Sequence, residues 1–351
     1  MRPSAFPASA ILALAASLAL AFPRPSAAQT SNDRAYLPAD LGPVSAADTV
    51  AIREWDVPWP GTRPRDPILD PLGRVWFVGQ RGNYLGALDP GTGEFGRQDL
   101  PPGALPHNVI VGPDGALWYA GNGDSHIGRV DSASGEITRF DVPVRDPHTL
   151  YFAPDGELWF TAQGANRIGR LDPATGNVQV VEPSVADARP YGIVVEPGGR
   201  PWIALFGTNR IATADPATME LVEHELPWDD ARVRRLDVTS DGSVWYVDYA
   251  RGTVGRLTPA TGAAVEWSAP GGSGARPYAM AIDDRDRIWF VETGSNPNRL
   301  VGFDPASEEF FAVTPIPSGG GTVRHMVFHA PTAALWFGTD ANTIGRATID
   351  P

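Results

Sequence analysis

The sequence contains no cysteine and no lysine. Without cysteine the chain forms no disulfide, has no thiolate nucleophile and offers no sulfur ligand to zinc. All 28 basic residues are arginine, which excludes Schiff-base chemistry on a lysine and a P-loop nucleotide site. The formal net charge of -13 argues against a nucleic-acid partner, because phosphate binding needs a basic surface.

Long apolar runs are scarce as well. The longest, residues 8–22, follows Arg2 and precedes three small residues at 26–28, the pattern of a secretory signal peptide. It is shorter than the roughly 20 residues that a membrane span requires. We therefore predict a signal peptide over residues 1–28, an N-terminal extension over 29–49, no membrane span, and an exported protein that is periplasmic or secreted.

The sequence is rich in an internal repeat. Seven tryptophans, each inside a short apolar run, recur at intervals of 41 to 47 residues: Trp76, Trp118, Trp159, Trp202, Trp245, Trp289 and Trp336. A period of this length, with short apolar runs and turns rich in Gly and Pro, is typical of propeller blades. We predict an all-β fold, a seven-bladed β-propeller over residues 50–351.

One repeat shows the expected blade. Residues 107–143 contain two apolar runs around a Gly-Pro-Asp-Gly turn, a third short run, a second turn and an alternating run. This pattern predicts a four-stranded antiparallel meander with the innermost strand first. The third strand repeatedly carries a glycine, as at Gly169 and Gly345, which we expect to make room for the repeat tryptophan.

The two chain ends predict how the ring closes. The last repeat stops at residues 347–351, where its outermost strand should begin. Residues 52–58 match residues 137–143, the outermost strand of another repeat, position for position. We therefore expect the N-terminal strand to complete the last blade, which removes exposed sheet edges. The alternative is an open stack of repeats.

Equivalent positions in the repeats predict a polar channel mouth. The residues eleven positions before each tryptophan are Arg65, His107, His148, Tyr191, Arg234, Tyr278 and His325. None is apolar, and in a closed propeller they should surround the mouth of the channel. We expect Arg65, His107, His148, Tyr191 and Arg234 to contact a small-molecule or peptide ligand. The alternative is that these side chains only fill the entrance.

A second set of equivalent positions contains acids in three blades only. Three residues after the tryptophan, blades 5 and 6 have Asp248 and Glu292, and blade 7 has Asp340 one step further. Strand geometry should place these acids near the polar mouth, where carboxylates can hold a divalent ion through oxygen. The alternative is ordinary ion pairing, for example between Arg234 and Asp248.

The repeat resembles that of the virginiamycin B lyase (streptogramin lyase) family. The resemblance rests on the blade core Asp-Gly-Glu-Leu-Trp-Phe-Thr at 155–161, on Ala-Asn-Arg-Ile-Gly-Arg at 165–170, and on the Pro-His or Pro-Tyr pairs that open inner strands. It covers about residues 50 to 351.

The resemblance implies a magnesium-assisted elimination that opens the ester-closed ring of a cyclic depsipeptide. It implies His325 as the base and Asp340 in the place of a metal-binding glutamate. The chain departs from the family pattern at Tyr278, where a second histidine is expected, and at Val323, where a second metal-binding glutamate is expected.

Three functional hypotheses follow. The first is a C–O lyase at the channel mouth, with His325 and Tyr278 as catalytic residues and Asp340, Glu292 and Asp248 around Mg²⁺. The second is a non-enzymatic propeller that binds a ligand or a protein at the same mouth. The third is a metal-dependent, lactonase-like hydrolase. In each case we expect a monomer.

Overall fold

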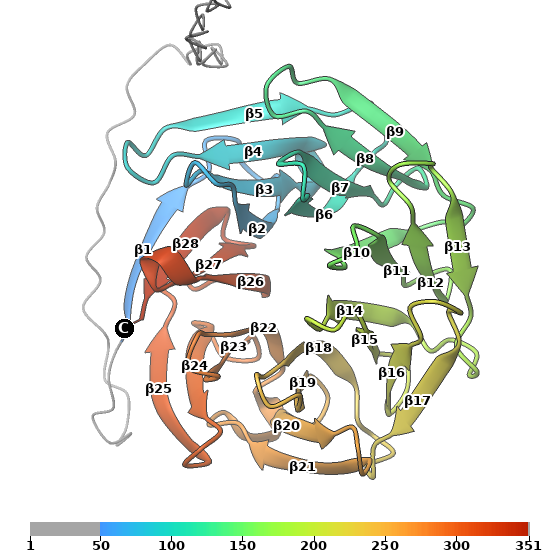
Figure 1. Ribbon diagram of the computed structural model, residues 1–351. Helices are drawn as coiled ribbons and strands as arrows, with labels where there is room; N and C mark the ends of the chain where they lie inside the picture. The colour runs from blue at the N-terminus through green and yellow to red at the C-terminus, as the bar shows by residue number, and fades with distance from the viewer. Residues whose placement is uncertain (1–49, 350–351) are drawn as a thin grey trace, which may run out of the picture.

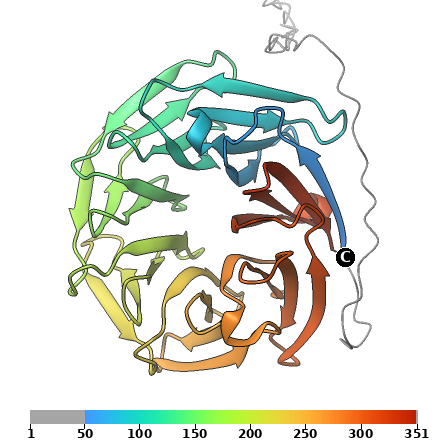
Figure 2. The same cartoon turned by 180° about the vertical axis from the view of Figure 1, so that it is seen from behind.

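The computed structural model describes residues 50–349, which form seven four-stranded antiparallel sheets around one central axis (Figure 1). The same ring is seen from behind in Figure 2. The predicted seven-bladed propeller is thus confirmed. The predicted signal peptide over 1–28 and the extension over 29–49 lie outside the described residues. Residues 50–349 include no helix with the length and apolarity that crossing a membrane would require.

Each blade runs from an innermost to an outermost strand. The innermost strands are β2 (Pro64–Leu69), β6 (Pro106–Val111), β10 (Pro147–Phe152), β14 (Pro190–Val195), β18 (Val233–Val238), β22 (Pro277–Ile282) and β26 (Val323–His329). The second strands are β3 (Val75–Gly79), β7 (Leu117–Gly121), β11 (Leu158–Ala162), β15 (Pro201–Leu205), β19 (Val244–Asp248), β23 (Ile288–Glu292) and β27 (Ala334–Thr339). The third are β4 (Tyr84–Leu88), β8 (His126–Val130), β12 (Arg167–Leu171), β16 (Arg210–Ala214), β20 (Thr253–Thr258), β24 (Arg299–Asp304) and β28 (Thr343–Thr348). The outermost are β5 (Phe95–Asp99), β9 (Ile137–Asp141), β13 (Val178–Val181), β17 (Leu221–Glu225), β21 (Ala263–Ser268), β25 (Glu309–Pro315) and β1 (Ala51–Asp56).

The N-terminal strand closes the ring as predicted. β1 pairs antiparallel with β28 and is the outermost strand of blade 7. Trp55 of β1 stacks on Trp336 with ring centroids 5.6 Å apart, as Phe140 of β9 stacks on Trp118 at 5.3 Å. The first and last strands of the described chain therefore share one sheet, and β28 is paired on both of its edges, like the third strand of every other blade.

The hydrophobic core lies between the blades. Residues 50–349 contain seven buried clusters, each of which joins two neighbouring sheets. The repeat tryptophans belong to these clusters, and Trp159, Trp245, Trp289 and Trp336 are each 1% exposed. Truncation of a buried tryptophan to alanine costs about 3–5 kcal/mol, so these residues hold the blades together.

The glycine of the third strand has a different neighbour from the one predicted. A Cβ on Gly169 would lie 2.1 Å from the ring of Phe160, not against the repeat Trp159. Gly169 is directly opposite Phe160 in the β11–β12 ladder, and opposite residues of an antiparallel pair share one face of the sheet. The tryptophan side chain projects from the other face, because successive side chains alternate.

Candidate functional site

The innermost strands begin with an irregularity that shapes the channel. In all seven, the pairing register with the second strand shifts by one residue near the start, as between Pro106 and Val109 of β6. Such bulges re-aim side chains. At the start of β18, for example, the consecutive residues Arg234 and Arg235 both contact residues of other blades, Tyr278 and Asp66. We call this end of the channel the upper end.

The residue opposite each repeat tryptophan fixes which residues are equivalent. In blades 1 to 6 it lies eight positions before the tryptophan, as in the pair Ile68 and Trp76. In blade 7 it lies nine positions before, because Val327 is opposite Trp336. The β26–β27 hairpin, which contains a short 3-10 turn (Ala330–Thr332), is therefore one residue longer.

This longer hairpin corrects one predicted equivalence. The blade 7 residue equivalent to Tyr278 is Arg324, so the count that placed His325 in the same ring is wrong by one residue. The upper ring consists of Arg65, His107, His148, Tyr191, Arg234, Tyr278 and Arg324. The middle ring, one residue further along each strand, consists of Asp66, Asn108, Thr149, Gly192, Arg235, Ala279 and His325. The lower ring, opposite the tryptophans, consists of Ile68, Ile110, Tyr151, Val194, Asp237, Ala281 and Val327.

Asp66 links the upper and middle rings. Its Oδ1 accepts a hydrogen bond from Arg65 Nε (3.0 Å), its Oδ2 accepts one from Asn108 Nδ2 (3.1 Å), and Arg235 lies 3.7 Å away as an ion pair. The side chain is fully buried. Burial alone would raise the pKa of Asp66, but Arg65, His325 and Arg235 hold this pKa far below its usual value. The carboxylate is therefore charged at neutral pH.

Arg234 lies inside an aromatic cluster. Its guanidinium carbon is 4.2 Å from the ring centroids of Phe206 and Tyr249 and 4.3 Å from that of Tyr278. Cation–π contacts of this kind contribute about 0.5–2 kcal/mol each. The alternative of an ion pair between Arg234 and Asp248 is wrong, because aromatic rings and not a carboxylate surround the Arg234 guanidinium.

Tyr191 and Tyr278 hydrogen-bond to each other through their hydroxyl groups. Burial alone would raise the pKa of Tyr191, but Arg65, Arg235 and Arg234 together lower it below its usual value. Burial, followed by the proximity of Tyr191, raises the pKa of Tyr278. Tyr191 is thus the more acidic phenol of the pair and accepts the hydrogen bond from Tyr278 when it ionises.

His107 and His148 contact each other, with ring centroids 3.5 Å apart. His107 Nδ1 lies 3.1 Å from the His148 carbonyl oxygen, and His148 Nδ1 lies 2.9 Å from Thr149 Oγ1. Burial, followed by the charge of Arg65, lowers the pKa of both rings well below the usual value. Both imidazoles are therefore neutral at pH 7. Their predicted role in ligand contact stays a prediction.

His325 has a free ring nitrogen. Within residues 50–349 its Nδ1 has no hydrogen-bond partner. Burial, and then the charge of Arg235, lowers the pKa of His325 to about 4, although Asp66 acts in the opposite direction. The ring is neutral at pH 7 and has a nitrogen that can accept a proton.

Asp340 is engaged by two arginines. Both of its oxygens accept hydrogen bonds from Arg324, with Arg324 Nη2 2.7 Å from Oδ2, and Arg63 Nε lies 3.6 Å from Oδ1. Arg324 is the upper-ring residue of the same blade. Asp340 therefore lies beside the mouth as predicted, but as part of a bidentate ion pair.

Glu292 and Asp248 are also engaged. Glu292 Oε2 accepts a hydrogen bond from Arg299 Nε (2.7 Å), and Oε1 accepts one from the Gly271 backbone N–H (2.7 Å). The Asp248 carboxylate accepts three hydrogen bonds of 2.9 to 3.0 Å, from the backbone N–H groups of Arg232, Ala250 and Arg251. Burial raises the pKa of Asp248 to about 6. Both acids thus stabilise the loops next to their strands.

These acids do not form a magnesium site in this arrangement. Mg²⁺ requires oxygen ligands in near-octahedral order, and within residues 50–349 no group of three or more His, Asp or Glu side chains is placed to hold a metal ion. The predicted ligands lie in three separate ion-pair or capping networks. Magnesium stays a prediction from the resemblance, and no chemical step is derived through it.

Repeat counting missed the middle ring and part of the aromatic cluster. Asp66 and Arg235 lie ten positions before their tryptophans, so the same count moved by one residue would have found them. Phe206 and Tyr249 lie in the loops after the second strands β15 and β19. Both lie four positions after their repeat tryptophans, the phase that carries Asp340 in blade 7, so a count at that phase would have found them as well.

The fold and this site define a class of protein: a closed seven-bladed β-propeller with a buried, arginine-rich and aromatic layer at one end of its channel. A sequence model of the virginiamycin B lyase family matches residues 41–259 and 178–351. The chain belongs to the virginiamycin B lyase family.

Solved structures agree with this fold. A virginiamycin B lyase from Staphylococcus aureus is 22% identical, covers 86% of this chain and 100% of its own, and superposes with a TM-score of 0.78. A catalytically inactive variant of that enzyme with quinupristin gives 23% identity, the same coverage and the same TM-score. A streptogramin B lyase is 24% identical over 88% of this chain and 100% of its own, also at 0.78. At this identity the likeness establishes the fold alone. No curated protein matches the sequence.

Proposed function

We propose that this chain is an exported ligand-binding propeller whose upper channel mouth holds a small molecule or peptide carrying a carboxylate and an aromatic ring. One observation carries the proposal: Arg65 and Arg235 share a single carboxylate, Asp66, and Arg234 beside them forms no ion pair within residues 50–349. Buried charge must be compensated. In a protein of net charge -13, this local excess of positive charge is best suited to an anionic ligand.

Unpaired donors and a nearby cavity support the same proposal. Arg65 Nη2, Arg234 Nε and Arg235 Nη2 are buried without a hydrogen-bond partner in residues 50–349, so these donors are available to a ligand oxygen. A cavity of about 290 Å³ opens beside Phe206, and its wall carries two arginines, Arg189 and Arg232, against one carboxylate, Asp187. A ligand aromatic ring against Phe206 would bring a carboxylate toward Arg234.

Calorimetry with N-acetylphenylalanine tests this proposal, with the neutral N-acetylphenylalanine amide as the matched ligand. We expect the carboxylate to bind at least tenfold more tightly than the amide, and Arg234→Gln to abolish this preference. Arg285→Gln, an exposed arginine in the β22–β23 turn at the opposite end, is the matched control and should keep the preference. Equal binding of both ligands, or an unchanged preference in Arg234→Gln, contradicts the proposal.

A C–O lyase is the second candidate, and His325 is the observation that favours it. Its free Nδ1 and neutral ring suit a general base, although a pKa of about 4 makes it a weak one. An anionic substrate nearby would raise that pKa. In an elimination the base removes an α-proton, a carbon–carbon double bond forms as the alkyl C–O bond of the ester breaks, and the electron pair of that bond leaves on the carboxylate. Because the ester closes a ring, the carboxylate stays on the opened chain and the product retains the mass of the substrate. The guanidinium groups of Arg235 and Arg65 are suited to polarise the ester carbonyl.

Quinupristin is the probe for this second candidate. The protein is incubated with it in EDTA and in magnesium, and liquid chromatography with fragmentation separates the ring from an open isomer of equal mass. We expect an open isomer in EDTA that His325→Ala does not form. No open isomer under either condition rejects the lyase and leaves the binding proposal standing. An isomer that forms only with magnesium contradicts the assignment of carbonyl polarisation to the arginines.

A further inference from the structure

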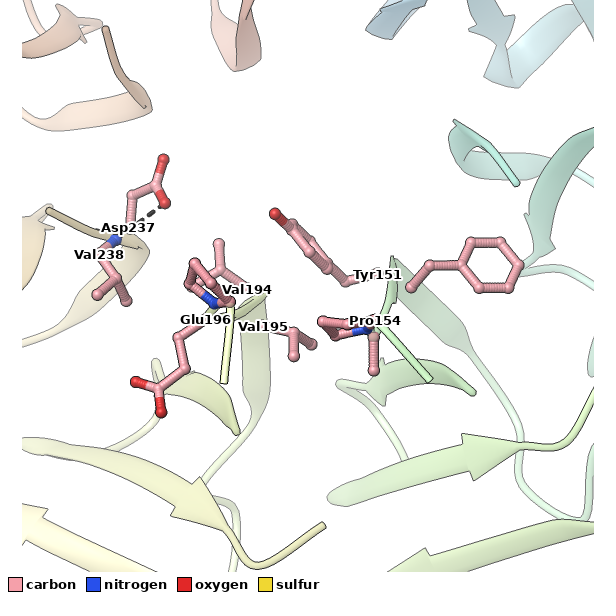
Figure 3. Close-up of a pocket in the computed structure, with 10 residues that line it drawn as sticks. Tyr151, Pro154, Val194, Val195, Glu196, Asp237 and Val238 are labelled. Carbon is pink, nitrogen blue, oxygen red and sulfur yellow. Dashed lines mark hydrogen bonds between the residues drawn. The ribbon is translucent and has the colours of Figure 1, made fainter. Parts of the chain in front are cut away.

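A second cavity opens at the lower end of the channel, between blades 3, 4 and 5 (Figure 3). Its volume is about 390 Å³, within the range of small-molecule sites. The lining residues are mainly apolar: Tyr151, Phe152, Ala153, Pro154, Val194, Val195, Glu196, Pro197, Asp237 and Val238. The Tyr151 ring and the Asp237 carboxylate project toward the same open space (Figure 3). The lower ring lies three residues after the upper ring on each innermost strand. At 3.3 Å per residue, the two rings are roughly 10 Å apart.

Asp237 breaks the pattern of the lower ring. The equivalent residues in the other blades are Ile68, Ile110, Tyr151, Val194, Ala281 and Val327. Asp237 is therefore the one carboxylate among these seven positions of the described chain. A charged residue on an otherwise apolar channel wall costs stability unless something compensates its charge.

Nothing in the described chain neutralises Asp237. Its carboxylate accepts a hydrogen bond from the Val238 backbone N–H (2.9 Å) and is also stabilised by the Ile282 backbone N–H, but no arginine or histidine of residues 50–349 forms an ion pair with it. Glu196, the other acid of the cavity, is engaged by Trp202 Nε1 (3.2 Å) and lies 4.0 Å from Arg200. Burial raises the pKa of Asp237 to about 6, which agrees with a carboxylate that lacks a cation.

Tyr151 faces this carboxylate with its ring still accessible. It is 38% exposed although it lies on an innermost strand, and the charge of Asp237 is one cause of its raised pKa, after burial. An aromatic face next to a carboxylate is a favourable site for an ammonium group, because the negative charge and the ring face both stabilise the bound cation. Phe152, Val194 and Val195 then offer an apolar wall for a hydrocarbon body.

We propose that the lower cavity binds a small hydrophobic amine, with its ammonium group on Asp237 and its apolar body against Tyr151 and Val194. This site is distinct from the arginine-rich upper mouth and takes a ligand of the opposite charge. An anion is disfavoured here, because both ionisable side chains at the cavity wall other than Tyr151 are carboxylates, Asp237 and Glu196.

The test uses 4-phenylbutylamine, with 4-phenyl-1-butanol as a neutral ligand of the same shape, and isothermal titration calorimetry at pH 8. The chain variants are Asp237→Asn, which keeps the side-chain shape, and Asp284→Asn. Asp284 is an exposed carboxylate in the β22–β23 turn at the same end of the channel and serves as the matched control. Thermal unfolding of each variant checks that the fold is retained.

We expect saturable amine binding that is at least tenfold tighter than that of the alcohol. Asp237→Asn should weaken amine binding at least tenfold, and Asp284→Asn should leave it unchanged. Val194→Trp, which fills the cavity, should abolish binding of both ligands. Equal affinity in Asp237→Asn, equal affinity for the alcohol, or no saturable binding up to 10 mM would each overturn the proposal. Loss of amine binding in Arg234→Gln alone would place the ligand at the upper mouth and also overturn it.

Discussion

Asp66 and Asp237 lie in the same channel, on innermost strands of the same repeat, yet they have opposite electrostatic environments. Asp66 contacts two arginines and an asparagine, and its pKa is held far below the usual value. Asp237 has no cation among residues 50–349, and burial raises its pKa to about 6. The comparison teaches that burial alone does not decide what a carboxylate does in a propeller channel. Its cross-blade partners decide.

The largest expected effect on stability comes from removing the negative charge of Asp66. Asp66→Asn leaves the buried guanidinium groups of Arg65 and Arg235 without a counter-charge, and loss of one partner of a buried ion pair costs about 3–5 kcal/mol. Because the folded pKa of Asp66 is depressed, its stabilisation is present above the unfolded value near 4 and is lost as pH falls further. Urea unfolding at pH 7 should therefore show a loss of this size.

Asp284→Asn is again the control for this measurement. Asp284 is exposed, and surface substitutions usually change stability by no more than about 0.5 kcal/mol. A loss below about 1 kcal/mol in Asp66→Asn would mean that water or Asn108 compensates the two arginines, and the central role of Asp66 would then be wrong.

Repeat spacing was sufficient to predict the architecture. The tryptophan period predicts seven blades, and the match of residues 52–58 to 137–143 predicts the strand that closes the ring. Both predictions depend on features that every blade shares, namely apolar runs, turn residues and one large ring per interface. Because these features recur in every blade, the pattern remains recognisable when a single blade is irregular.

The site depends on exceptions and was therefore predicted only in part. The upper ring was found by counting back from each tryptophan, except in blade 7, where one extra hairpin residue moved His325 out of phase and Arg324 into the ring. Asp340 forms an ion pair with Arg324, and Glu292 forms one with Arg299. A single sequence does not predict which arginine pairs with which acid. Asp237 was missed because the lower ring was not counted.

His325 offers a second, smaller way to sharpen the comparison, since it lies near Asp66. Its folded pKa of about 4 is below the usual value near 6.5, so the folded state binds fewer protons than the unfolded state between these values. Stability should therefore fall as pH drops from 7 to 5. For a half-buried ring we expect this residue to account for about 1–2 kcal/mol of the fall.

The measurement is urea unfolding of wild type and His325→Gln at pH 7 and pH 5. The wild type should lose more stability than the variant between the two values, because the variant lacks the imidazole of His325. His107 and His148 remain in both proteins and their contribution cancels in the difference. The same loss in both proteins would show that His325 is hydrated and titrates normally.

The smallest effect is expected at the Asp237 end, and its sign is opposite to that at Asp66. A folded pKa near 6 lies above the unfolded value near 4, so ionisation of Asp237 costs stability that is absent below pH 4 and complete above pH 6. Asp237→Asn removes this cost and should stabilise the protein by about 1 kcal/mol at pH 8, after allowance for the water that reaches the cavity. The gain in stability should be smaller at pH 5, and 4-phenylbutylamine should stabilise the wild type at pH 8 but not the variant.

A variant less stable than wild type at pH 8 would show that Asp237 has a counter-charge after all, and the two ends of the channel would then be alike.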